Sequence, residues 1–134
     1  VFGKPDATKL EIYNALLSGF EAGTKYLRPG VQLKEVYHKT LEAIRNCGFP
    51  AYIRGHFGHG LGAGLGSEQW PFISANEETT LQPGMVMAFE CPWYIDGVGG
   101  MIIENQFLVT DNGHEMMNKL PFGLGEINNV SNGI

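Results

Sequence analysis

The chain has 134 residues, of which 43% are hydrophobic, and its formal net charge is −5. This length and composition allow one hydrophobic core, and therefore a single domain or a large piece of one. The nine Lys and Arg residues form no basic run, which excludes the usual electrostatic surface of a nucleic-acid-binding protein. No apolar stretch approaches the ~20 residues of a membrane span, so we expect a cytoplasmic protein with no membrane partner.

Two amphipathic helices are predicted, over about residues 5–27 and 32–47. Their apolar side chains recur every three to four residues, the period of a helix with one buried face. The start of the first helix is open between Thr8, with Glu11 as its capping-box partner, and the earlier Asp6. The side chains expected to be buried against a sheet are Leu17, Phe20, Val36, Leu41 and Ile44.

A glycine-rich run follows the helices and excludes a packed helix there, because glycine favours unusual backbone conformations or close approach to a ligand. Its members are Gly55, Gly58, Gly60, Gly62, Gly64 and Gly66. The run lacks the Gly-Lys-Ser/Thr ending of a phosphate-binding loop. Further on, residues 85–90 and 101–110 are predicted as strands, the second closed by a turn at 111–113. Helices followed by strands predict the α+β class.

One histidine and two glutamates could carry chemistry. His59 stands between two glycines, which leave its ring free to meet a metal ion or a substrate, although a lone histidine is more often an ordinary residue. Glu90 and Glu104 lie at or inside apolar strands, where a buried carboxylate without a partner is costly. For either glutamate alone, the alternative is an exposed position on the wet face of its strand. Together the three form a nitrogen and oxygen donor set that suits Mn, Fe, Co or Zn.

Several short motifs stand in a fixed order along the chain. They are Gly58-His59-Gly60-Leu61-Gly62, Leu81-Gln82-Pro83-Gly84-Met85-Val86, Phe89-Glu90, Gly99-Gly100 and Ile103-Glu104. This order resembles the signature of the pita-bread metallopeptidases, a family that includes methionine aminopeptidase, aminopeptidase P, prolidase and creatinase. The resemblance implies a partial pita-bread fold, in which two helices pack on a curved antiparallel sheet. It also implies that His59, Glu90 and Glu104 are metal ligands, with metal-binding atoms within about 5 Å of one another.

The family site takes two further aspartate ligands from upstream strands, and no aspartate of this chain matches them. Residues 1–134 are therefore expected to be the C-terminal part of the catalytic domain, without those strands. Such a piece would be inactive alone, and three ligands shared between two ions would hold neither ion firmly.

For the full-length protein the resemblance implies a homodimeric hydrolase that splits an amide bond in short peptides, as Xaa-Pro dipeptidases and aminopeptidases do. Two divalent cations would serve it, Mn first, with Co, Zn or Fe as alternatives. Glu90 and His59 would act in catalysis, while His56 and Glu68 would bind the substrate. Glu68 stands where relatives usually carry a second histidine, and Ile102 where many carry an arginine. These departures keep two alternatives open, a creatinase-like hydrolase of a small C–N substrate and a catalytically inactive binding module.

Overall fold

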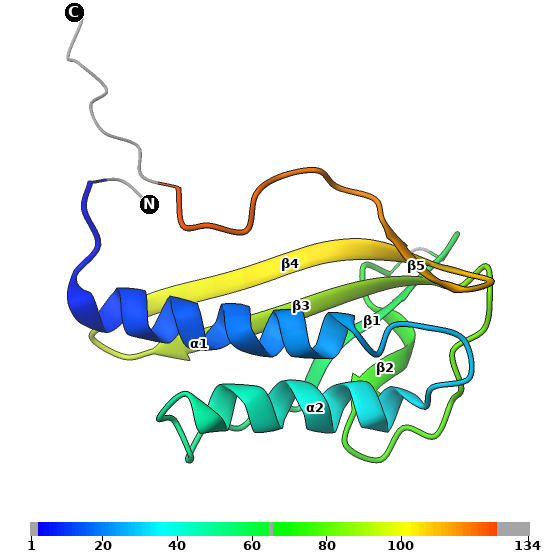
Figure 1. Ribbon diagram of the computed structural model, residues 1–134, viewed down its shortest axis with the longest axis horizontal. Coiled ribbons are helices and arrows are strands. Elements are labelled where there is room, and N and C mark those ends of the chain that lie inside the picture. Colours follow the sequence, from blue (N-terminus) through cyan, green and yellow to red (C-terminus); the bar gives the residue numbers. More distant parts are fainter. Residues whose placement is uncertain (1–2, 65, 126–134) are drawn as a thin grey trace, which may run out of the picture.

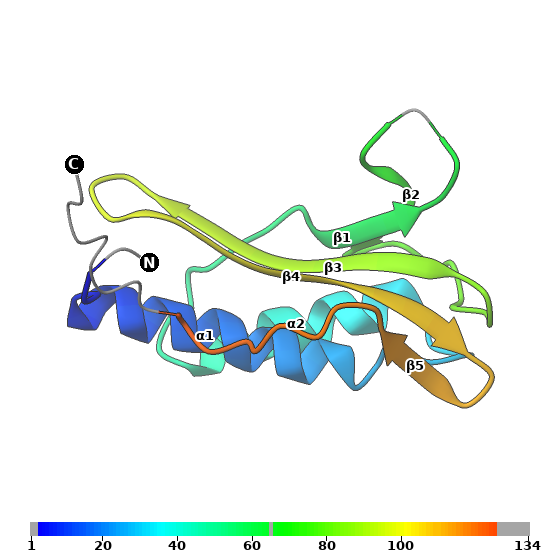
Figure 2. The same cartoon turned by 90° about the horizontal axis from the view of Figure 1, so that it is seen from above.

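A computed structural model describes residues 3–64 and 66–125 of the chain. Two helices precede five strands: α1 (Ala7–Thr24), α2 (Leu33–Asn46), β1 (His56–Leu61), β2 (Gln69–Ser74), β3 (Val86–Ile95), β4 (Gly99–Thr110) and β5 (Gly113–Met116). The strands form one antiparallel sheet in the order β2-β1-β3-β4-β5. Both helices lie on the same face of this sheet (Figures 1 and 2). The predicted α+β class and antiparallel sheet are confirmed. Neither helix in the described part has the length and apolar content needed to cross a membrane.

The first helix starts at the earlier of its two predicted positions. Asp6 is the N-cap, and its carboxylate accepts a hydrogen bond of 2.8 Å from the backbone N–H of Lys9. The capping box of Thr8 and Glu11 is not used, because both residues already lie inside the helix. A side chain that satisfies a free N–H at a helix start stabilises the first turn.

The buried face of the helices agrees in part with the prediction. Phe20, Val36 and Ile44 are at most 1% exposed, as expected. Leu17 and Leu41 are only half-buried and pack at the margin of the core. The predicted burial is therefore only partial for these two leucines.

Two glycines of α1 explain the difference. A Cβ atom added at Gly19 would meet the Ile44 side chain, and one added at Gly23 would meet Thr40 and the Phe89 ring. Because neither glycine has a Cβ, α1 approaches α2 and the sheet most closely along this line, on which Leu16 is fully buried. The face of α1 that packs against α2 and the sheet is therefore centred on these small residues, and is rotated away from the larger apolar residues used for the prediction.

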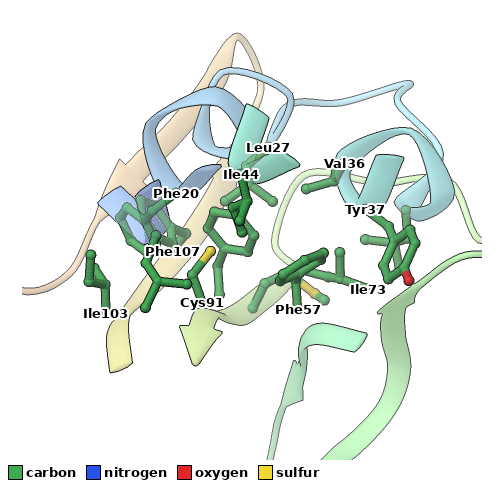
Figure 3. Close-up of a cluster of buried hydrophobic side chains, with 14 of the residues drawn as sticks. Phe20, Leu27, Val36, Tyr37, Ile44, Phe57, Ile73, Cys91, Ile103 and Phe107 are labelled. Atoms are coloured by element: carbon green, nitrogen blue, oxygen red, sulfur yellow. The ribbon is translucent and has the colours of Figure 1, made fainter. Parts of the chain in front are cut away.

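The core lies between the helix pair and the sheet (Figure 3). Phe20 of α1 stacks on Phe89 of β3 with ring centroids 4.9 Å apart. Tyr37 of α2 contacts Phe57, whose ring lies at the start of β1, at 5.1 Å. Phe89 and its alternate neighbours along β3 therefore face the helices, and the residues between them face the other side of the sheet.

Three strands were not predicted, and β1 is the most important of them. It occupies the first half of the glycine-rich run and pairs with β2 on one side and with β3 on the other. Glycine is a weak strand former, so the local pattern favoured a loop. Pairing on both edges decides the structure instead. The unusual backbone expected in this run is present at Gly58, whose φ is 135°.

Candidate active site

Glu90 and Glu104 face each other across neighbouring strands. They are directly opposed in the register of β3 and β4, so their side chains project from the same face of the sheet. Their neighbours Phe89 and Ile103 are buried in the core on the helix side. Alternation along each strand therefore places both glutamates on the face away from the helices.

His59 belongs to the same face. It pairs with Ala88, which stands two residues before Glu90 on β3. The residue is buried, with 8% of its surface exposed, and its Nδ1 lies 3.0 Å from the carbonyl oxygen of Gly60. A carbonyl only accepts, so this hydrogen bond requires the proton on Nδ1 and leaves a lone pair on Nε2. A neutral imidazole in this tautomer is suited to bind a metal ion.

His56 and His59 are three residues apart, and simple alternation would put them on opposite faces. The pairing of β1 with β2 shifts register between them, and Gly58 lies in that interval. As a result His56 reaches the same surroundings, with its Nδ1 3.7 Å from Glu90 Oε1. The Gly58 conformation thus brings both histidines of β1 toward the glutamates.

Glu68 reaches the site from the loop between β1 and β2. One of its carboxylate oxygens lies 3.8 Å from His56 Nε2, and 54% of its side chain is exposed. The two residues predicted to bind substrate therefore lie next to each other. Solvent surrounds more of Glu68 than of His56, whose side chain is 25% exposed.

Arg54 is a site residue that the sequence reasoning missed. Its Nη2 lies 3.4 Å from Glu90 Oε1, and the two side chains are 28% and 12% exposed. The only signal in the sequence is a basic residue two positions before His56, after the apolar Tyr52 and Ile53. Such a signal does not distinguish a site residue from an ordinary surface arginine.

The three predicted ligands share a face, but their binding atoms do not form a ready-made metal site. Within residues 3–64 and 66–125, no group of three His, Cys, Asp or Glu side chains is arranged to hold a metal ion. The expected gathering of the ligand atoms within about 5 Å stays a prediction. Glu90 Oε1 lies 3.4 Å from Arg54 Nη2, so this carboxylate already has a cationic partner.

The donor set nevertheless fits divalent metal ions. Its three members come from adjacent strands β1, β3 and β4 and project from one face of the sheet. Glu104 is exposed, and its carboxylate has no hydrogen bond or ion pair with any other described residue. Directly opposed like charges cost free energy that a cation would offset. One imidazole and two carboxylates suit Mn, Fe, Co or Zn.

Ile102 and Cys91, each close in sequence to a candidate ligand, lie on different sides of the sheet. Ile102 stands two residues before Glu104, on the same face, and is 44% exposed. Cys91 follows Glu90 and is completely buried on the helix side, where burial raises the pKa of its thiol. Ile102 therefore borders the candidate site, whereas Cys91 belongs to the core.

The comparisons with known proteins identify the family. The profile of metallopeptidase family M24 matches residues 1–111, and the chain belongs to this family. The chain is 35% identical over 119 residues to the Xaa-Pro dipeptidase of Pyrococcus furiosus, covering 89% of this chain and 34% of that protein. It therefore spans about a third of the length of the curated relatives that it matches.

Solved structures agree with this assignment. The dipeptidase PepE of Mycobacterium ulcerans superposes with a TM-score of 0.87 at 30% identity, over 95% of this chain and 34% of that one. The Xaa-Pro dipeptidase of Bacillus anthracis gives a TM-score of 0.86 at 31% identity, over 95% and 35% of the two chains. The pita-bread fold implied by the sequence motifs is confirmed.

Proposed function

We propose that the protein is a metal-dependent peptidase that cleaves an amide bond in short peptides, with Xaa-Pro dipeptides as the first candidates. One observation carries the proposal: His59, Glu90 and Glu104 project from one face of three adjacent strands in a chain of metallopeptidase family M24. The Xaa-Pro dipeptidases among its relatives support the substrate class.

His59, Glu90 and Glu104 would hold two divalent cations, together with two aspartates expected upstream of this chain. Mn is our first choice, with Co, Zn or Fe as alternatives. When bound, such a pair supplies a water molecule whose pKa is lowered toward neutrality. His59 offers its neutral Nε2, because the Gly60 carbonyl holds the proton on Nδ1. Glu90 would accept the proton that the water loses and return it to the departing amine.

The substrate would bind between the sheet face and the β1–β2 loop. His56 and Glu68, whose side chains lie 3.8 Å apart, would contact its polar groups. A recess of about 330 Å³ opens beside Arg54 and is lined by Tyr52, Pro92, Trp93 and Tyr94 among others. Its aromatic walls suit an apolar side chain or a proline ring. A homodimeric state and a cytoplasmic location stay predictions from the sequence.

The test compares the full-length protein with its Glu90→Gln variant, each supplied with Mn²⁺ or Co²⁺, on a panel of Xaa-Pro and non-proline dipeptides. We expect turnover by the wild type and a loss of about 100-fold or more in kcat for the variant, because the amide cannot accept the proton. Glu11→Gln changes an exposed glutamate of α1 and should leave kcat unchanged. Full activity of Glu90→Gln would refute the proposal.

The same assay tests the 134-residue chain alone, which we expect to be inactive. Two dications facing only two carboxylates leave an excess of positive charge that the upstream aspartates would neutralise. Robust turnover by this piece would contradict the two-metal reading.

A creatinase-like hydrolase of a small C–N substrate is the second candidate. Ile102 keeps it open, because this residue stands two positions before Glu104, where many relatives carry an arginine. A full-length protein that binds metal but splits no peptide would support it. Failure to bind metal at all would support a catalytically inactive binding module instead.

A further inference from the structure

We propose that Arg54 is a positioning residue, which holds Glu90 by one carboxylate oxygen and leaves the other oxygen for a metal ion. The inference rests on the proposed function, since it assigns Glu90 as a ligand. Arg54 Nη2 lies 3.4 Å from Glu90 Oε1, and Glu90 is the more buried partner, with 12% of its side chain exposed. An ion pair that is partly shielded from solvent is screened less than one on the open surface.

His56 does not compete with Arg54 for this role, although its Nδ1 lies 3.7 Å from the same Oε1. The backbone N–H of Gly58 donates a hydrogen bond of 3.3 Å to His56 Nδ1. That nitrogen therefore carries a lone pair, and a lone pair cannot donate to a carboxylate. Arg54 is thus the group that donates to Glu90.

The guanidinium of Arg54 is itself held in place. Its Nε donates to the carbonyl oxygen of His56 at 3.1 Å, and its own backbone carbonyl accepts from the Tyr37 hydroxyl at 2.6 Å. The neighbouring Tyr52 hydroxyl donates at 2.7 Å to the carbonyl of Pro92, two residues after Glu90. These bonds fasten the segment before β1 to α2 and to β3. A planar guanidinium anchored at Nε keeps its remaining donors in a fixed direction.

The contacts of Glu90 are one-sided. Both neighbours, Arg54 and His56, approach Oε1, and no hydrogen bond or ion pair within the described residues reaches Oε2. A carboxylate held through one oxygen presents the other in a defined direction. Outer partners of this kind orient ligands and typically change metal affinity 10- to 100-fold when removed.

The charge of Arg54 and its positioning role predict opposite changes in metal affinity when Arg54 is replaced. A guanidinium beside the site repels a dication, so if only its charge mattered, Arg54→Met would tighten metal binding. If Arg54 positions Glu90, the same substitution weakens binding. The direction of the change therefore separates the two effects.

The experiment titrates the full-length protein with Co²⁺, alone and without substrate, and follows binding by calorimetry and by the visible absorption of the bound ion. For Arg54→Met we expect an affinity about 10- to 100-fold lower and a changed absorption band. Arg54→Lys should recover part of the affinity, because it keeps a donor for Glu90. Arg28→Met is the matched control: Arg28 is exposed in the segment between α1 and α2 and has no contact with Glu90 among the described residues. It should change neither the affinity nor the band.

An affinity for Co²⁺ that is unchanged or higher in Arg54→Met, with the fold retained by circular dichroism, would overturn the inference. If the methionine variant does not fold, Arg54→Lys decides, and an affinity equal to or above the wild type is the contrary result. Glu90→Gln separates this failure from that of the proposed function. If Glu90→Gln loses Co²⁺ binding and Arg54→Met does not, only the role of Arg54 falls; if Glu90→Gln binds normally, the metal site itself is wrong.

Discussion

At the scale of single residues, Gly58 determines where the two histidines of β1 point. Its φ of 135° is a conformation that side chains with a Cβ rarely adopt. A Cβ at this position would also meet the carbonyl oxygen of Ala88 on β3. The glycine thus permits both the local twist of β1 and its close approach to the strand that carries Glu90.

We expect Gly58→Ala to lower the free energy of unfolding by more than about 1 kcal/mol, because alanine is strained at positive φ and meets β3 as well. Gly97→Ala is the control, since Gly97 also has a positive φ, of 73°, but has open space around it. Its loss should be clearly smaller. Urea unfolding of both variants measures the difference, and equal losses would show that the contact with Ala88 does not matter.

The candidate site was predictable where a residue stands in a recognisable motif, and not elsewhere. His59, Glu90 and Glu104 could be singled out because glycines or apolar strand residues surround each of them. Arg54 could not, because its role depends on Glu90, which lies on β3 and 36 residues further along the chain. Nothing in the residues next to Arg54 indicates that contact.

At the scale of elements, α1 is fixed to the sheet mainly through Phe20. This side chain is 1% exposed and contacts three other rings, those of Phe89, Phe107 and Phe122. Aromatic packing of this kind adds to the free energy gained from burial. The sheet strand β3, which carries Glu90, therefore rests on α1 at the residue next to that glutamate.

Phe20→Ala should lower the free energy of unfolding by about 3–5 kcal/mol, the usual cost of removing a buried aromatic side chain. Leu10→Ala removes an apolar side chain from the same helix where it is 37% exposed, and should cost less than about 1 kcal/mol. Chemical denaturation followed by circular dichroism tests both. Similar costs for the two variants would mean that α1 does not pack as described.

Helices and strands with a clear pattern of apolar residues were predictable from the sequence. Strands that form only because neighbouring strands pair with them were not. The helices and the strands β3 and β4 carry long apolar patterns, so their type was correct, although β3 runs on to Ile95. This extension follows from pairing with β4, which continues to Gly99. β1 gave no local signal, because its strand conformation comes from the neighbours that pair with it.

At the scale of the whole molecule, two buried groups that lose a proton at high pH, a thiol and a phenol, make the protein less stable at alkaline pH. Burial raises the pKa of the Cys91 thiol well above its usual value, and the nearby Glu90 charge adds to this effect. Burial also raises the pKa of the Tyr52 phenol. Because both groups stay neutral in the folded protein, the unfolded chain loses its protons first as pH rises.

The contribution of these two groups to the free energy of unfolding should therefore be constant below about pH 8.5. Above that pH it should fall, by at most about 1.4 kcal/mol per pH unit for each group. Cys91→Ala should remove the first part of this fall, while its cavity lowers stability at neutral pH. Cys47→Ala, at an exposed cysteine, should leave the pH dependence unchanged. Urea midpoints between pH 7 and 10 provide the measurement, and a flat profile for the wild type would contradict the burial of Cys91.

The hairpin of β3 and β4 restricts how the chain can change in length. Glu90 and Glu104 stand at equal distances along the chain from Gly97, near the tip of the hairpin. Inserting one residue into a single arm between its glutamate and the tip would turn one carboxylate toward the helices, because successive side chains alternate between faces. Inserting two would restore the face but leave the carboxylates no longer opposite each other. During evolution, the segments between each glutamate and the tip can therefore change in length only if both change equally. The tip itself can lengthen without disturbing the pair of glutamates.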